Sequence, residues 1–116
     1  MVNRIVVGAH YGLRDWLAQR VTAVLMAAYT LVLAAALLFA PAIDLAYWHA
    51  LMSGGLMRFL SFLFIVGLAY HAWIGVRDIW MDYVQPVGIR LTLHVLTLLL
   101  LVGCVGWAVQ VLWRLA

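Results

Sequence analysis

The stretch FLSFLFIVGLAYHAWIGV, residues 59–76, is an unbroken run of uncharged residues between Arg58 and Arg77. An α-helix that crosses the hydrocarbon core of a bilayer needs roughly 20 such residues, with a range of about 17–25. The backbone of a spanning segment must also satisfy its own hydrogen bonds, and a helix does so within one segment. The run lacks the alternation of apolar and polar residues that is typical of a barrel strand. It therefore predicts a membrane-spanning helix.

Two similar runs lie on either side of this one along the chain. Residues 21–43 and residues 91–113 carry no charged side chain. The earlier run is too long for the apolar core of a cleaved signal peptide, so we expect it to be retained as a span. The sequence thus predicts an all-α integral membrane protein in one domain, residues 1–116, with three transmembrane helices at about 17–40, 57–82 and 89–113.

The composition agrees with a membrane protein and excludes several other classes. Of the 116 residues, 69% are hydrophobic and 9% are charged, whereas soluble domains average roughly 45–50% and about 25%. A soluble domain of this size could not bury so much apolar surface. The formal net charge of +3 is spread thinly along the chain, so no nucleic-acid partner is predicted. The single cysteine, Cys104, lies in an apolar run, which excludes a disulfide framework.

The arginines set the expected orientation in the membrane. Arg58 and Arg114 lie at one end of the predicted spans, and the other end has five: Arg4, Arg14, Arg20, Arg77 and Arg90. Positively charged residues are retained on the cytoplasmic side, so the N-terminus and the second loop are expected in the cytoplasm. Residues 42–52, which include Tyr47 and Trp48, are predicted to form a short helix at the opposite interface.

His71 is an ionisable residue inside an otherwise apolar span. Such groups are costly at membrane depth and usually face a protein interior or a functional site. Gly67 and Gly75 stand four residues before and after it on the same helix face, which would clear space for a flat ligand such as a porphyrin. Imidazole is a standard axial ligand of haem iron. The alternative is a histidine hydrogen-bonded across a glycine-lined helix contact, and position alone leaves both interpretations open.

The other histidines offer His71 no matched second ligand. His10 and His49 lie outside the predicted spans. At about 1.5 Å per residue, His71 lies ~15 Å from the cytoplasmic end of its span, whereas His94 is only about one helical turn inside the third span. We therefore predict that His94 is a packing or interfacial residue. A haem with two histidine ligands would take the second one from another subunit.

Polar residues gather at the cytoplasmic end of the second predicted span, namely Arg77, Asp78, Asp82 and Tyr83. A carboxylate and a phenol at a membrane surface could hydrogen-bond a lipophilic carbonyl compound, such as a quinone, and relay protons to it. The same residues are also typical of a solvated helix end with an interfacial tyrosine. Before the first span, Arg14 and Arg20 could pair with an anionic group such as a haem propionate or a lipid phosphate, or could serve only to set the topology.

Two motifs at a fixed spacing carry a resemblance to a known family. They are HAWIG at residues 71–75 and DYVQP at residues 82–86, followed by Arg90 and Leu91. The sequence GLRDW at residues 12–16, with Arg20, Thr22 and Ala23, supports them at the start of the first span. Together they resemble the small hydrophobic membrane-anchor (cytochrome b) subunit of bacterial succinate dehydrogenase, respiratory complex II. Length, three spans and topology agree, so the resemblance covers essentially the whole chain.

The resemblance implies a shared haem. In this family the anchor packs with a second three-helix subunit, the large cytochrome b anchor, and the two subunits hold one b-type haem. His71 matches the axial ligand of the haem iron that this subunit supplies, and the partner supplies the other ligand. Arg20 matches a basic residue near the haem propionates, and Arg14 is a further candidate for a propionate contact.

The resemblance also implies a ubiquinone site. Tyr83 matches the tyrosine that hydrogen-bonds a ubiquinone carbonyl, and Asp82 matches the adjacent acid that assists proton delivery. The iron–sulfur subunit would complete this site from the cytoplasm, and the flavoprotein subunit would oxidise succinate. The expected location is the lipid bilayer of the bacterial inner membrane, and the chain alone is expected to be inactive.

The chain departs from the family pattern at two positions. Gln85 stands where the family has a lysine, and Arg14 stands where it has a histidine. A fumarate reductase anchor is the nearest alternative, because this subunit does not define the direction of the reaction, although a mid-span histidine favours the haem-bearing dehydrogenase type. A non-redox structural subunit or small transport component is the alternative of another class.

Overall fold

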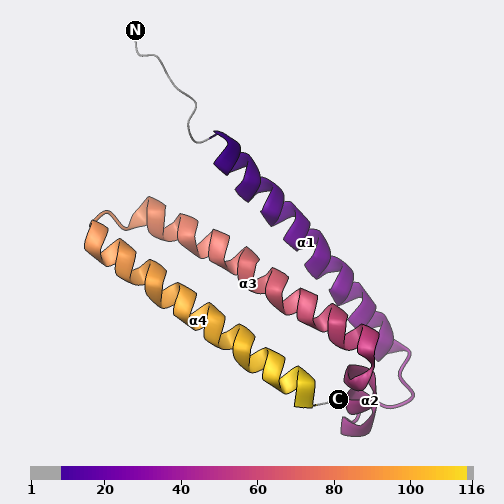
Figure 1. Ribbon diagram of the computed structural model, residues 1–116. Helices are drawn as coiled ribbons and strands as arrows, with labels where there is room; N and C mark the ends of the chain where they lie inside the picture. The colour runs from indigo at the N-terminus through magenta and orange to yellow at the C-terminus, as the bar shows by residue number, and fades with distance from the viewer. Residues whose placement is uncertain (1–8, 115–116) are drawn as a thin grey trace.

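The computed structural model describes residues 9–114, and every regular element in that part of the chain is a helix (Figure 1). There are four: α1 (Ala9–Leu38), α2 (Leu45–Ser53), α3 (Gly55–Tyr83) and α4 (Val87–Arg114). Three of them are long and apolar enough to cross a membrane: residues Gly12–Leu38 of α1, together with α3 and α4. This confirms the prediction of three spans. Arg4, one of the arginines used for the orientation, lies outside the described residues.

The short helix α2 confirms the element predicted for residues 42–52, but it begins later. Asp44 stands at its N-cap, where the carboxylate accepts a hydrogen bond of 2.8 Å from the backbone N–H of Tyr47. An N-cap residue adopts an extended backbone, so the helix starts after it. Gly54, also extended, separates α2 from α3. At the other end of α3, Pro86 disfavours helical backbone in the preceding residue, which fits the break between α3 and α4.

The three long helices form a single layer with α3 in the middle (Figure 1). Helix α3 contacts α1 on one side and α4 on the other, and within residues 9–114 the backbones of α1 and α4 do not come close to each other. The start of α1 and the loop between α3 and α4 lie at one end of this layer, and α2 lies at the other (Figure 1). A layer one helix thick leaves both of its broad faces uncovered by the chain itself.

Helix α1 contacts α3 through residues spaced three or four apart, which places them on one helix face. Leu25 packs on Gly67: a Cβ at position 67 would come within 2.9 Å of the leucine Cδ2. Tyr29 is buried, stacks on Phe64 with ring centroids 4.6 Å apart, and makes a hydrogen bond of 2.6 Å with Ser61. Polar and apolar contacts thus alternate along the antiparallel contact between α1 and α3, which we call the α1–α3 seam.

Gly67 and Gly75 do not clear space for a ligand in the way that the sequence suggested. Leu25 fills the space beside Gly67, and the nearest atom to a Cβ at Gly75 would be the side-chain nitrogen of Gln19, at 3.9 Å. Both glycines therefore face α1, where they allow close approach of the two helices.

Lengthening the side chain at position 67 is expected to destabilise the chain. Gly67→Leu would overpack the α1–α3 seam, at a cost of about 1–3 kcal/mol in the free energy of unfolding. Gly67→Ala should cost less, because the leucine methyl that it meets is the end of a flexible side chain. Gly103→Leu in α4 is the matched control, since a Cβ there has no atom within 4 Å. Equal losses for the two leucine variants, measured by unfolding in detergent, would contradict this packing.

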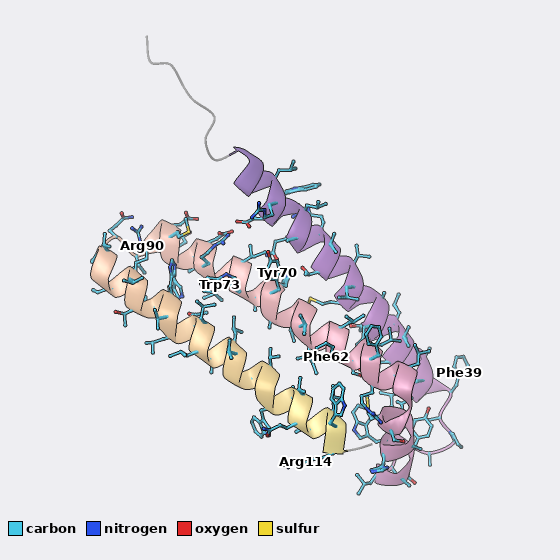
Figure 2. All side chains as sticks on the ribbon, in the orientation of Figure 1. Phe39, Phe62, Tyr70, Trp73, Arg90 and Arg114 are labelled. Carbon is cyan, nitrogen blue, oxygen red and sulfur yellow. The ribbon has the colours of Figure 1, made fainter. Side chains whose placement is uncertain are left out.

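The side of α3 that faces α4 is largely apolar. Trp73 extends toward α4 (Figure 2), and its ring lies edge-on to His94 with centroids 5.8 Å apart. The indole N–H of Trp80 donates a hydrogen bond of 3.0 Å to the Thr97 hydroxyl. Between these helices lies an apolar cavity of about 300 Å³ whose lining includes Tyr70 and Trp73.

Near α2 the helices share a small core. Tyr29, Met52, Met57 and Leu112 are buried there against one another. Arg58 donates a hydrogen bond of 2.8 Å to the Ser53 carbonyl at the end of α2, and its guanidinium lies 5.8 Å from the Trp113 ring centroid. These contacts hold α2 across the ends of α3 and α4.

Candidate functional site

The side chain of His71 is tied to α1 at one ring nitrogen. Its Nδ1 lies 2.9 Å from the hydroxyl oxygen of Thr22, a residue that is only 8% exposed. The same hydroxyl donates to the Ala18 carbonyl oxygen at 2.7 Å, one turn earlier in α1. A threonine hydroxyl has a single proton but two lone pairs, so it can accept a bond from His71 while it donates to the carbonyl. The proton of a neutral His71 then lies on Nδ1.

The other ring nitrogen of His71, Nε2, is left with a free lone pair that reaches the surface of the chain. His71 is only partly buried, and its Nε2 has no hydrogen-bond partner among the described residues. It is also not one of the buried atoms that lack a partner. An imidazole held at Nδ1 and open at Nε2 is the usual arrangement of a metal-ligating histidine. The residues present therefore fit an axial haem ligand.

His94 differs from His71 in the helix that it contacts and in the burial of its Nε2 atom. It lies on α4 and packs against Trp73, whereas His71 contacts α1 on the opposite side of α3. Its Nε2 is buried and has no partner within the described part of the chain. The contact with Trp73 agrees with the prediction of a packing or interfacial residue, and the two histidines make their contacts on opposite sides of α3.

No site for a metal ion held by this chain alone is found among residues 9–114, because no group of three or more histidine, cysteine, aspartate or glutamate side chains could hold an ion there. A haem differs, because the porphyrin supplies the equatorial ligands and each protein side chain adds one axial bond. The described residues thus fit haem ligation by one histidine better than a bare metal ion.

An ion pair that the sequence analysis missed joins the start of α1 to the end of α3. The Arg77 guanidinium hydrogen-bonds the Asp15 carboxylate and lies 3.7 Å from that of Asp78. The side chains of Arg77 and Asp15 are 25% and 33% exposed. Two buried atoms at this contact, Gln19 Oε1 and Arg77 Nε, have no hydrogen-bond partner among the described residues. Polar side chains of α1 and α3 thus lie on the same helix–helix contact as Thr22 and His71.

Asp15→Asn and Arg77→Gln are each expected to destabilise the protein by about 1–3 kcal/mol, because each breaks the hydrogen-bonded ion pair between α1 and α3. The double variant should lose less than the sum of the two single losses, since the Asp15–Arg77 interaction can be lost only once. The test is to measure the stability of the wild type, the two single variants and the double variant by thermal unfolding. Strictly additive losses would show that the two side chains do not interact.

The predicted quinone residues Asp82 and Tyr83 are the last two residues of α3. Both are exposed, and Tyr83 is 80% exposed. The break after them is held by a hydrogen bond of 3.1 Å from the Val84 N–H to the Trp80 carbonyl. Neither residue lines the cavity beside Trp73 or the one near α2. The chain thus presents a phenol and a carboxylate outward, without enclosing a pocket around them.

The two predicted propionate residues lie on the exposed surface of α1. The Arg20 guanidinium lies 4.7 Å from the centroid of the Trp16 ring, a cation–π contact within the same helix. Arg20 precedes Thr22 by two residues, so at about 100° per residue the two side chains point roughly in opposite directions. Arg14 is exposed as well. Neither arginine is brought next to His71 by the fold of this chain.

Comparison with known proteins identifies the family of the chain. The model of the succinate dehydrogenase/fumarate reductase transmembrane subunit family matches residues 3–110. The hydrophobic membrane anchor subunit of succinate dehydrogenase from Coxiella burnetii is 42% identical over 102 residues, which cover 88% of this chain and 89% of that protein. The chain therefore belongs to the family of succinate dehydrogenase/fumarate reductase transmembrane subunits.

Proposed function

We propose that this chain is the small membrane anchor of a succinate:ubiquinone oxidoreductase, that it supplies one axial ligand to a b-type haem, and that it contributes to the ubiquinone site. The observation that carries the proposal is the state of His71. Its Nδ1 is held by Thr22, and its Nε2 is open to a ligand from outside the chain. When bound, the haem would accept and donate single electrons.

The second axial ligand comes from another subunit. His94 lies on the far side of α3 from the Thr22 contact, and His49 lies in α2 at the opposite end of the layer from the loop between α3 and α4 (Figure 1). Neither side chain shares the α1-facing side of α3 with His71. A large cytochrome b anchor of the kind expected from the sequence would supply this ligand and cover part of the exposed layer.

The chain itself has little packing to hold it together, which supports assembly with partners. Only five apolar side chains in the described residues are buried, and four of them form the cluster near α2. The remaining apolar surface of the three long helices needs lipid or another membrane helix against it. A second three-helix subunit would bury one broad face of the layer, and lipid the rest.

The ubiquinone site lies at the end of α3. The Tyr83 hydroxyl donates a hydrogen bond to a quinone carbonyl oxygen, and Asp82 assists proton delivery to the quinone. Because Tyr83 is 80% exposed, other subunits must supply the walls of the pocket and exclude water. The iron–sulfur subunit takes this position on the cytoplasmic side, followed by the flavoprotein that oxidises succinate.

This arrangement requires the loop between α3 and α4 to face the cytoplasm of a bacterium whose inner membrane holds the complex. Arg77 and Arg90 flank that loop, and Arg14 and Arg20 lie on the segment of α1 at the same end (Figure 1). The excess of arginine supports this orientation. Arg14 and Arg20 would then lie on the side from which haem propionates or lipid phosphates could be bound.

Purification of the complex through an affinity tag on this chain tests the proposal. Iron–sulfur and flavoprotein subunits should copurify, with a b-type haem that dithionite reduces and with succinate-dependent ubiquinone reduction. Absence of these subunits would support a non-redox membrane protein, and a redox complex without haem would refute the role of His71. Quinol-dependent fumarate reduction faster than succinate oxidation would instead identify a fumarate reductase.

A further inference from the structure

Thr22 hydrogen-bonds both its own helix backbone and His71 through one hydroxyl group. It is 8% exposed, its Oγ1 donates to the Ala18 carbonyl at 2.7 Å, and it lies 2.9 Å from His71 Nδ1. The Gln19 carbonyl also lies near the hydroxyl, at 3.2 Å. Both backbone oxygens are acceptors only, so the hydroxyl proton is directed toward α1 itself. The lone pairs of the hydroxyl remain for the imidazole.

We propose that Thr22 is the positioning residue of the haem ligand, an inference that rests on the proposed function of His71. By accepting the Nδ1–H bond, the threonine selects the tautomer of His71 in which Nε2 carries the free lone pair. It also fixes the rotation of the ring, because Thr22 is buried and its own hydroxyl is held by the helix backbone. The ligand is therefore orientated before the iron is bound.

The same bond affects the electronic properties of the ligand. When the ring N–H that does not face the metal donates a hydrogen bond, the imidazole becomes more basic and donates electrons more strongly to the metal through its other nitrogen. The Thr22 hydroxyl is a better acceptor because it donates to a carbonyl at the same time. Stronger donation favours ferric over ferrous iron. Thr22 should therefore hold the midpoint potential of the haem below the value that it would have without this bond.

The α1–α3 seam explains why a threonine can reach the histidine. Leu25 lies against Gly67, so α1 approaches α3 closely one turn from His71. A threonine in a helix commonly bonds the carbonyl four residues earlier, and Thr30 does so with the Met26 carbonyl at 2.8 Å. Thr30 is exposed and has no histidine beside it, so it reproduces the backbone bond of Thr22 without the ligand contact.

The experiment compares Thr22→Val, Thr22→Ser and Thr30→Val in the assembled complex. Valine keeps the shape of threonine but removes the acceptor, and serine keeps the acceptor. Redox titration of the haem absorbance gives the midpoint potential, electron paramagnetic resonance gives the g-values of ferric haem, and haem content per flavin is measured during dilution. Thr22→Val should raise the potential, change the g-values and weaken haem retention by about 10–100-fold, the usual effect of losing such a partner. Thr22→Ser and Thr30→Val should resemble the wild type.

An unchanged potential, unchanged g-values and unchanged haem retention in Thr22→Val would overturn the inference, even if the complex melted earlier, because a purely structural bond would alter stability alone. If Thr22→Val does not assemble, Thr22→Ser decides: wild-type values support the inference and a shifted potential contradicts it. Failure of the proposed function looks different, since the wild-type complex would then lack the haem or would keep its spectrum when His71 is replaced.

Discussion

Replacing His71 with alanine is expected to abolish the low-spin b-type haem spectrum of the assembled complex. A low-spin haem needs two strong axial ligands, and alanine removes the one that this chain supplies. The open Nε2 is the only described atom of His71 that is available for such a bond, because Thr22 occupies Nδ1. Optical difference spectra and electron paramagnetic resonance of the purified complex measure the loss.

His94→Ala is the matched control for this prediction. It removes an imidazole from the α3–α4 contact with Trp73 instead of from the α1–α3 contact, so the haem spectrum should survive. Imidazole added to the His71→Ala complex should restore part of the low-spin signal if haem is retained. An unchanged spectrum in His71→Ala would eliminate this residue as a ligand, and loss of haem in both variants would indicate general misfolding.

Removing the hydroxyl of Tyr83 is the second change with a large expected effect. Tyr83→Phe should lower kcat/KM for ubiquinone by roughly 10²-fold, as expected when one preorganised hydrogen-bond donor is removed from a reacting oxygen. Folding should not change, because Tyr83 is 80% exposed and lies at the end of α3. Steady-state assays with a short-chain ubiquinone measure the loss.

Two controls separate a quinone effect from a general defect. Succinate oxidation with an electron acceptor that reacts before the quinone site should be unchanged in Tyr83→Phe. Tyr70→Phe removes a hydroxyl from the same helix, one residue before His71, and should leave ubiquinone reduction unaltered. Quinone reduction at the wild-type rate in Tyr83→Phe would exclude the tyrosine as the donor.

The fold was largely predictable because hydropathy depends on each segment alone. The three long helices match the three predicted spans, with differences at their ends. Helix α1 extends back to Ala9 because a helix does not need to stop where the hydrocarbon stops, and Arg14 and Asp15 are compatible with helical backbone. Helix α2 starts after Asp44 because of its capping bond. Such ends depend on local hydrogen bonds that hydropathy does not report.

The site was predictable only where a residue is unusual for its position. His71 could be identified because an imidazole is rare inside a span. Thr22 could not be assigned a role, because a helical threonine usually bonds its own backbone and His71 is 49 residues away in the sequence. The Asp15–Arg77 pair was missed for a similar reason: the register between α1 and α3 determines it, and the sequence of either helix alone does not define that register.

The glycines around His71 show how a correct observation led to a wrong expectation. Gly67 and Gly75 do share the face of His71, but that face is turned toward α1. Leu25 and Gln19 occupy the space that the sequence assigned to a ligand. The atom of His71 that is left open is instead Nε2, on the side of the imidazole away from Thr22.

A structure of the complete complex tests the central claim most directly. It should show the haem iron bonded to Nε2 of His71 on one side and to a residue of another membrane subunit on the other, with Thr22 still bonded to Nδ1. Ligation of the iron entirely by other subunits, or a protein group hydrogen-bonded to Nε2 in place of the iron, would contradict the account.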